Sequence, residues 1–200
     1  HALLITGGPF PSTTLPLPKA DLIIAADQGG DHAQELNLVI DLLIGDFDSC
    51  SLETIKNAKK KRQYPTDKDV TDLELALMAA LEVGATSVTI LTSVRGRFDH
   101  SLGNLLIAAS SKWKNLKIEL IADNNRIKII RNTEKIFGEP GDLLTLFSIG
   151  GTAFGVSSKG LKWELEGNDL VSGTGLGISN KLITREAEIS IEKGVLISIQ

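Results

Sequence analysis

Five short apolar segments, separated by helix-like patterns, constrain the fold of the first 122 residues. They are residues 2–6 (ALLIT), 21–26 (DLIIAA), 42–44 (LLI), 87–92 (SVTILT) and 116–122 (LKIELIA). Unbroken apolar strands of this length are typical of a sheet that is covered on both faces. The helical candidates between them are residues 31–38, 52–60, 72–83 and 101–113. The first part of the chain therefore predicts a mostly parallel α/β (Rossmann-like) domain.

The pattern changes at about Arg126. From there the chain has alternating or β-branched runs, such as RIKIIRN and DLLTLFSIGG, that are separated by Gly, Asn and Asp, with no convincing helix. Repeated short strands with glycine-rich turns are typical of an antiparallel sandwich. We therefore expect an α/β domain at residues 1–125 and a C-terminal antiparallel β-sandwich at residues 126–200.

Composition excludes several classes of protein. Hydrophobic residues make up 42 % of the 200 residues and the net charge is −4, which argues against a general nucleic-acid binder. No apolar run approaches the ~20 residues that cross a bilayer. The one cysteine, Cys50, cannot form an internal disulfide, so the sequence predicts a cytoplasmic protein that binds neither nucleic acid nor membrane.

Polar clusters follow several of the predicted strands. They are residues 27–30 (DQGG), 45–49 (GDFDS), 67–72 (DKDVTD) and 95–100 (RGRFDH). Ligands of open parallel sheets bind outside the carboxyl ends of the strands. Convergence of the four loops at that edge would gather five or more carboxylates beside Lys68, Arg95 and Arg97.

Such a set of residues favours one kind of chemistry. Carboxylates this close repel one another unless a cation neutralises them, and oxygen ligands without His or Cys select Mg²⁺ or Mn²⁺. Lysine and arginine suit the remaining charge of a polyphosphate. The clusters therefore indicate a metal–polyphosphate site and phosphoryl or pyrophosphoryl transfer.

Each cluster also has a purely structural interpretation. An Asp-x-Asp after a strand is a common turn, and Asp27 could cap the helix that follows Gly30. Thr71 forms a capping box with Glu74, which places Asp72 at the first position of a helix. The occurrence of four clusters at one predicted edge is what favours the functional interpretation.

The C-terminal part has one informative stretch, residues 159–165 (KGLKWEL). Alternation puts Trp163 on the same side as Leu161 and Leu165. Trp163 is then either a core residue of the sandwich or a platform for a flat cationic ligand. Residues 175–180 (GLGISN) could supply hydrogen bonds nearby or form a hairpin turn.

The same motifs, in the same order, resemble the thiamine pyrophosphokinase family. They are ITGG at 5–8, ADQGG at 26–30, LLIGDFDS at 42–49, YPTDKDVTDLE at 64–74, GRFDHSLGN at 96–104, GLKWEL at 160–165 and GISN at 177–180. The GDxDS, DKDxTD and GRxDH motifs together are specific. Many family members have DGGA where this chain has DQGG.

The resemblance implies an ATP-dependent transfer of diphosphate to thiamine, which gives thiamine diphosphate and AMP in a homodimer with active sites between subunits. It implies Mg²⁺ on Asp46, Asp48 and Asp72, and catalytic roles for Asp72, Arg97 and Asp99. ATP would be bound by Asp27, Gly29, Lys68, Asp69, Thr71 and Arg97. Thiamine would be bound by Trp163, Ser179 and Asn180.

Two other functions remain open from the residues. An apolar strand followed by Asp-x-Asp also resembles haloacid-dehalogenase-type phosphatases, in which Asp46 would be a covalent nucleophile. Cys50 stands where that pattern has Thr or Val, and the C-terminal part is left unexplained. The third possibility is a sensor that binds nucleotide or thiamine without turnover.

Overall fold

The computed structural model describes residues 1–200 and divides them into two compact units. Unit 1 comprises His1–Ile107 and Asn115–Asn124. Unit 2 comprises Ala108–Lys114 and Asn125–Gln200.

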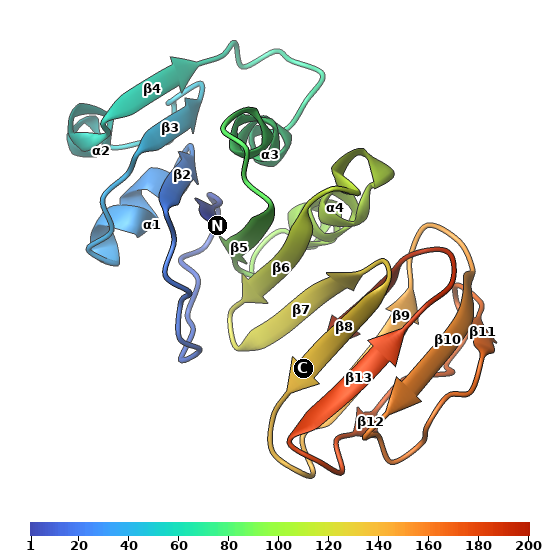
Figure 1. The fold of residues 1–200 in the computed structure, drawn as a ribbon. Coiled ribbons are helices and arrows are strands. Elements are labelled where there is room, and N and C mark those ends of the chain that lie inside the picture. Colours follow the sequence, from blue (N-terminus) through green and yellow to red (C-terminus); the bar gives the residue numbers. More distant parts are fainter. The chain divides into compact units, whose positions relative to one another are not determined.

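Unit 1 contains a parallel sheet of six strands in the order β6-β5-β1-β2-β3-β4 (Figure 1). The sheet extends from β1 towards β4 along the chain and then resumes with β5 on the other side of β1. This reversal between β1 and β5 is a topological switch point, where open α/β sheets leave a crevice for ligands. The strands are β1 (Ala2–Ile5), β2 (Leu22–Ala26), β3 (Leu42–Gly45), β4 (Lys60–Gln63), β5 (Ser87–Thr92) and β6 (Lys117–Ala122).

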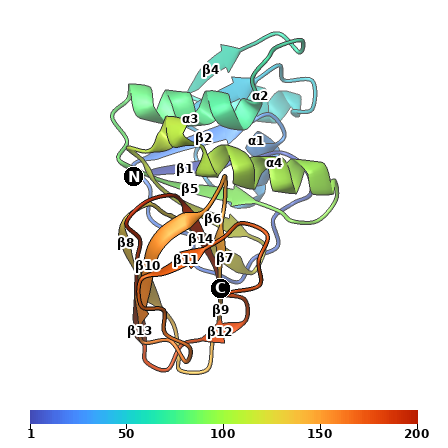
Figure 2. The same ribbon diagram turned by 90° about the vertical axis from the view of Figure 1, so that its right-hand side faces the viewer.

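Helices lie on both faces of this sheet. They are α1 (Gly29–Glu35), α2 (Leu52–Asn57), α3 (Asp72–Glu82) and α4 (Phe98–Ala109), whose last two residues belong to unit 2. Helix α1 packs on β1 and β2, and α3 packs on β1, β2 and β3. Figure 2 shows α3 and α4 on the same side of the strands. No helix combines the length and the apolar character that crossing a membrane requires.

The double cover explains the unbroken apolar strands. Leu3, Ile5, Leu43, Leu91 and Ile121 come from four different strands and are each at most 1 % exposed in one core cluster. The predicted capping box also forms, because Thr71 Oγ1 accepts from Glu74 N at 3.2 Å and Glu74 Oε2 accepts from Thr71 N at 3.3 Å. This confirms Asp72 as the first residue of α3.

Three of the predicted helices have different bounds in the structure. Helix α1 spans Gly29–Glu35, whereas residues 31–38 were predicted. Helix α2 ends at Asn57, before the predicted end at residue 60, and residues 60–63 form the edge strand β4 beside β3. A charged edge strand discourages pairing with other chains, which accounts for its lysines. Helix α4 begins at Phe98, earlier than predicted, and ends at Ala109 before a short 3₁₀ turn at Ser111–Trp113.

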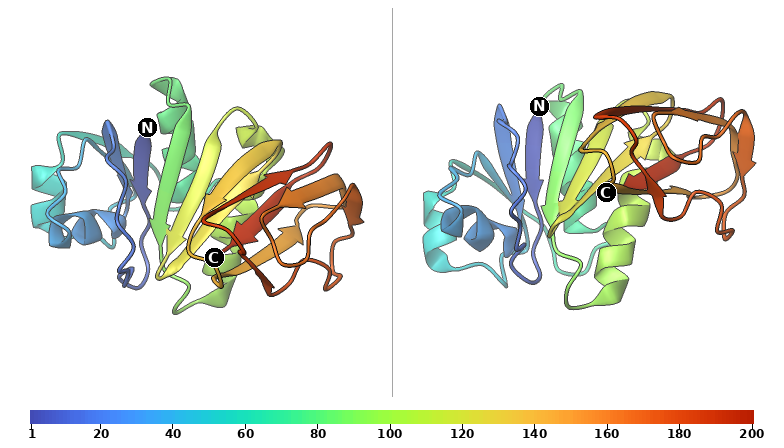
Figure 3. Two further views of the ribbon diagram at one scale, coloured as in Figure 1. Left: turned by 60° about the horizontal axis from the view of Figure 1, so that its bottom comes forward. Right: turned by 90° about the horizontal axis from the view of Figure 1, so that it is seen from below.

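Unit 2 contains two antiparallel sheets (Figure 3), with strand orders β12-β9-β14-β7 and β11-β10-β13-β8. Buried Ile130 and Leu144 from the first sheet share one core cluster with Ile136 and Ile189 from the second. No helix occurs after residue 124, as predicted. The strands are β7 (Asn125–Ile130), β8 (Thr133–Phe137), β9 (Leu143–Ser148), β10 (Ala153–Lys159), β11 (Asn168–Leu170), β12 (Asn180–Lys181), β13 (Glu186–Ser190) and β14 (Leu196–Ile199).

Candidate active site

Unit 1 has a cavity of about 740 Å³ at the switch point of its sheet. Its walls are the segments that follow β1, β2 and β5, the loop before α3 and the first turns of α4. Three carboxylates and three Lys or Arg side chains among the lining residues come from the predicted clusters, namely Asp27, Asp72, Asp99, Lys68, Arg95 and Arg97. The cavity thus gathers fewer carboxylates than the five or more expected from the sequence.

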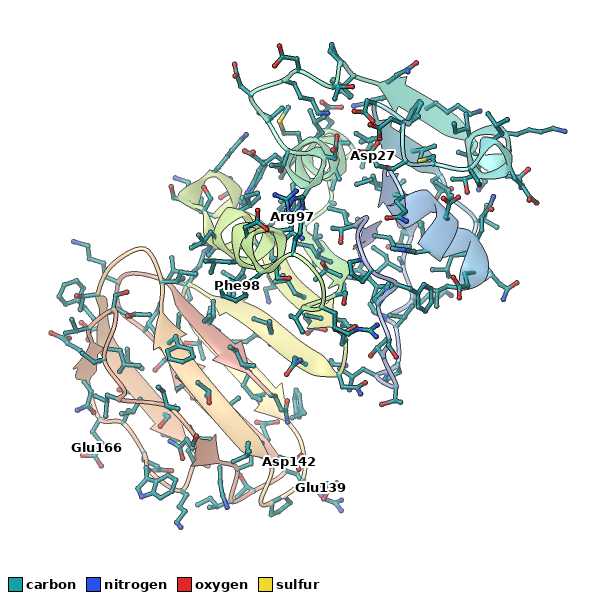
Figure 4. The ribbon with its side chains drawn as sticks, turned by 180° about the vertical axis from the view of Figure 1, so that it is seen from behind. Asp27, Arg97, Phe98, Glu139, Asp142 and Glu166 are labelled. Carbon is teal, nitrogen blue, oxygen red and sulfur yellow. The ribbon has the colours of Figure 1, made fainter.

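Asp27 directly follows β2 in a left-handed conformation, with φ of 45°, and is labelled in Figure 4. Its carboxylate accepts from Phe47 N at 3.2 Å and does not cap α1, so the helix-capping interpretation is wrong. Gly45 makes room for it, because a Cβ there would lie 1.6 Å from Asp27 Oδ1. Burial, with a hydrogen bond and charge repulsion from Asp72, raises the pKa of Asp27 to about 7.

Lys68 and Asp72 form an ion pair beside Asp27. Lys68 Nζ lies 3.1 Å from Asp72 Oδ1, which is a buried oxygen atom, and also donates to Pro65 O at 3.2 Å. Burial acts to lower the pKa of Lys68, but the hydrogen bond and charge of Asp72 outweigh it and the pKa is raised. The ammonium therefore stays protonated at the cavity wall.

Asp46 and Asp48 follow β3 and interact with each other. Asp48 N donates to Asp46 Oδ1 at 3.0 Å, and this bond, with one from Thr66, lowers the pKa of Asp46. Hydrogen bonding and charge repulsion from Asp46 raise the pKa of Asp48. Neither side chain lines the cavity, although the adjacent Ser49 does.

The predicted metal ligands do not form a closed cluster in this structure. No group of three or more His, Cys, Asp or Glu side chains is arranged to hold a metal ion. The donors are nevertheless all carboxylate oxygens, and Asp27 is affected by the charges of both Asp72 and Asp46. Such a donor set fits Mg²⁺, which takes one or two protein carboxylates and fills its shell with water and phosphate oxygens.

Arg97 and Asp99 pair with each other at the start of α4, where Figure 4 labels Arg97 and Phe98. Arg97 Nη2 donates to Asp99 Oδ2 at 2.6 Å and Arg97 Nε donates to Asp99 Oδ1 at 3.2 Å. The pair lowers the pKa of Asp99 and raises that of Arg97. Both side chains are more than 60 % exposed, so the guanidinium can turn to another anion at little cost.

Three further predicted ATP-binding residues have different environments. Thr71 lines the cavity, but Asp69 is exposed and lies outside the lining. Gly29 is buried at the start of α1, where a Cβ would lie 2.1 Å from Ile5 O. The absence of a Cβ therefore allows α1 to pack closely against β1.

Other polar side chains of the cavity wall had no predicted role. Gln28, which belongs to the DQGG cluster, accepts through its Oε1 from Gly8 N at 3.2 Å and so holds the glycine turn after β1. Thr6 and Thr92 lie outside the predicted clusters. Thr92 Oγ1 accepts from Thr6 Oγ1 at 2.9 Å and from Asn104 Nδ2 at 3.3 Å, which joins β1, β5 and α4. Thr6 and Thr92 are the polar residues that end two of the apolar runs. A polar residue at the end of a predicted strand is the sequence signal that could have identified them.

Trp163 of unit 2 differs from its predicted orientation. Leu161 and Leu165 are buried, but Trp163 is 54 % exposed and is not a core residue. Lys162 Nζ lies 4.5 Å from the centroid of its ring. An exposed indole with a cation already at its ring is compatible with the platform interpretation.

The other two predicted thiamine-binding residues have separate roles. Asn180 is 3 % exposed. Its Oδ1 accepts from Trp163 N at 3.1 Å and its Nδ2 donates to Trp163 O at 2.7 Å, so it holds the backbone of Trp163. Ser179 is exposed, has φ of 58°, and donates its N–H to Thr145 Oγ1 at 3.0 Å.

Comparison with known families gives matches along nearly the whole chain. The model described as "Thiamin pyrophosphokinase, catalytic domain" matches residues 15–120, and the model described as "Thiamin pyrophosphokinase, vitamin B1 binding domain" matches residues 124–196. The chain belongs to the thiamine pyrophosphokinase family. This confirms the resemblance predicted from the motifs.

Individual relatives agree with the family models. The thiamine pyrophosphokinase of Bacillus subtilis is 29 % identical over 206 residues, which cover 98 % of this chain and 96 % of that protein. Its crystal structure superposes with a TM-score of 0.86 at 28 % identity, covering 100 % of this chain and 97 % of that one. A thiamin pyrophosphokinase family protein from Enterococcus faecalis gives the same TM-score, identity and coverage. These likenesses confirm a mixed α/β fold with C-terminal antiparallel strands.

Proposed function

We propose that this protein is a Mg²⁺-dependent thiamine pyrophosphokinase that transfers the diphosphate group of ATP to the hydroxyl of thiamine, giving thiamine diphosphate and AMP. The observation that carries the proposal is the match of both family models, in order, to residues 15–120 and 124–196. The cavity of unit 1, with its acids, lysine and arginines at the switch point, supports it.

The proposal divides the work between two domains. Residues 1–125 form a Rossmann-like domain that binds nucleotide and Mg²⁺, and residues 126–200 form a β-sandwich that binds thiamine through Trp163, Ser179 and Asn180. The exposure of Trp163 supports this assignment. Asn180 contributes by holding Trp163, because both polar atoms of its amide are already engaged with the backbone of that residue.

In the ATP complex, Asp46, Asp48 and Asp72 would hold the Mg²⁺ ion. The ion supplies positive charge that neutralises the polyphosphate and stabilises negative charge in the transition state. The protein's own residues bind and orient the nucleotide. These residues are Asp27, Gly29, Lys68, Asp69, Thr71 and Arg97.

Arg97, Asp99 and Asp72 act closest to the reaction. The thiamine oxygen attacks the β-phosphorus in line, and AMP leaves on the opposite side. Arg97 exchanges its contact with Asp99 for the phosphate oxygens, where its planar fork fits two acceptors. Asp99 or Asp72 accepts the hydroxyl proton, and a loose transition state asks little of that base. Positioning and charge stabilisation then carry most of the catalysis.

For the assembly and the location, we propose a cytoplasmic homodimer with active sites between subunits, whose partners are ATP and thiamine. Family membership supports this proposal.

A coupled assay for AMP tests this function. Purified protein with ATP and Mg²⁺ is expected to release AMP with thiamine, and none without an acceptor. Asp46→Asn and Asp72→Asn are each expected to lower turnover by at least about a hundredfold, because a lost metal carboxylate costs several kcal/mol of barrier. Asp67→Asn, an exposed carboxylate of the same loop, is the matched control.

Other results would refute the proposal. A phospho-aspartate trapped at Asp46 would establish a phosphatase of the haloacid-dehalogenase type. Binding of ATP and thiamine without AMP release in the presence of Mg²⁺ would establish a sensor. Near-normal turnover of folded Asp46→Asn and Asp72→Asn variants would exclude the metal assignment.

A further inference from the structure

Asp123 of unit 1 lies directly after β6, outside the cavity lining, and joins two other loops. Its side chain is 13 % exposed and its backbone is left-handed, with φ of 51°. Oδ1 accepts from Ser12 N at 2.9 Å, in the loop after β1. Oδ2 accepts from Ser93 Oγ at 3.0 Å and from Val94 N at 3.1 Å, in the loop after β5.

Arg95 extends this network across the same two loops. Its Nη2 donates to Phe10 O at 2.6 Å and lies 3.5 Å from Asp123 Oδ1. Its backbone N–H donates to Ser93 Oγ at 3.1 Å. The loops are also in close contact, because a Cβ on Gly96 would lie 2.7 Å from Pro9 Cγ.

The loops that Asp123 joins are walls of the cavity. Pro9, Ser93, Gly96 and Arg97 line it. Arg97 is exposed and bonds only locally, to Asp99, so the place of its backbone depends on how the loop before it is held. The two oxygens of this carboxylate accept from three donors, whereas an amide has a single acceptor oxygen and would turn an N–H₂ group towards donors.

We propose that Asp123 is a positioning residue for the reaction: it fixes residues 8–14 and 93–97 so that Arg97 meets the polyphosphate of ATP. The inference rests on the proposed function, and Asp123 itself does not touch substrate. Misplacing a substrate-holding group by about an ångström is enough to lower catalytic efficiency by up to about a hundredfold.

The test compares Asp123→Asn and Asp123→Ala with the wild type in the AMP assay and by limited trypsin digestion. We expect the KM for ATP to rise at least about tenfold, with a smaller change in kcat and an unchanged KM for thiamine. Trypsin is expected to cleave faster after Arg95 and Arg97, because the loop that carries both sites is released.

The matched control is Asp142→Asn. Asp142 holds a turn of unit 2 by accepting from Glu139 N at 2.8 Å, and Figure 4 labels both residues. The Asp142→Asn substitution is expected to leave the KM for ATP and the tryptic cleavage after Arg95 and Arg97 unchanged. If Asp123→Ala does not fold, Ser93→Ala is the milder variant. It removes one donor to Asp123 and the acceptor of the Arg95 N–H, leaves the bonds of Asp123 to Ser12 N and Val94 N, and should give a smaller shift in the same direction.

An unchanged KM for ATP in folded Asp123 variants, together with wild-type tryptic cleavage, would overturn the inference. An equal rise of the KM for ATP in the Asp142→Asn control would also overturn it, since the effect would then reflect general destabilisation. If the wild type itself released no AMP, the proposed function would fail. The tryptic cleavage would still report whether Asp123 holds the two loops.

Discussion

Replacing Asp27 with asparagine is expected to stabilise the metal-free protein while lowering its activity. The Asp27 carboxylate is partly buried beside Asp72, and this environment disfavours its charge. Asparagine has nearly the same shape, and its Oδ1 can still accept from Phe47 N. The substitution therefore removes the unfavourable charge and keeps the local hydrogen bond.

The size and sign of the effect follow from the pKa of Asp27. Its value of about 7 compares with an ordinary 3.8, and a difference of that size corresponds to about 4 kcal/mol. Because the side chain is partly exposed, screening by solvent should reduce this to about 2 kcal/mol. A raised carboxyl pKa costs stability above the unfolded value, so the gain from asparagine is absent below pH 3.8 and complete above pH 7.

Urea unfolding in EDTA at pH 5 and pH 8 measures this gain. We expect Asp27→Asn to raise the free energy of unfolding by about 2 kcal/mol at pH 8 and by less than half of that at pH 5. The AMP assay should show reduced turnover, because the carboxylate is retained for the site at a cost in stability. Asp67→Asn is the control for removing an exposed charge.

Two results would refute this reasoning. A gain that is the same at both pH values would show that the charge of Asp27 is not the source. A loss of stability at pH 8 would show that the carboxylate makes favourable interactions that asparagine cannot replace.

Three further predictions concern the supports of the two units. Gly45→Ala should destabilise the protein by about 1–3 kcal/mol and reduce AMP release, because its Cβ would displace the neighbouring carboxylate. Gly84→Ala is the control, because Gly84 also has a positive φ but has open space around it. This variant should lose stability without an equal loss of AMP release. Asn180→Ala should raise the KM for thiamine and leave that for ATP unchanged, since it frees the backbone of Trp163; equal changes in both constants would contradict this. Ser51→Ala should cost about 1 kcal/mol in urea unfolding by removing the cap of α2, and no change would show that the cap contributes nothing.

Local patterns were enough for the main elements of the fold. Apolar runs predicted five of the six strands of unit 1, and the capping box predicted the start of α3 at Asp72. The strand at residues 60–63 was not predicted because four polar residues carry no periodic signal, and only pairing with β3 makes them a strand.

The candidate site was only partly predictable. The carboxyl ends of parallel strands meet at one edge of the sheet, and this rule predicted that the loops of Asp27, Lys68 and Asp72 would converge. The three residues do line one cavity. Residues further from the motifs were missed, as with Asp123, whose partners Ser12 and Ser93 lie 111 and 30 positions away along the chain. Such contacts depend on the order of strands in the sheet, which a single sequence does not encode locally.

The amino-acid sequence by itself determined most of the helices and strands of unit 1, the change of pattern near residue 126 and the family of this protein. The tertiary structure decided the environment of each polar group. It decided that Asp27 meets Asp72 and Phe47 and does not cap a helix, and that Trp163 is exposed between two buried leucines. The physical reason is that periodicity reports which residue types can be buried, whereas charge and hydrogen bonding depend on neighbours that only the folded chain brings together.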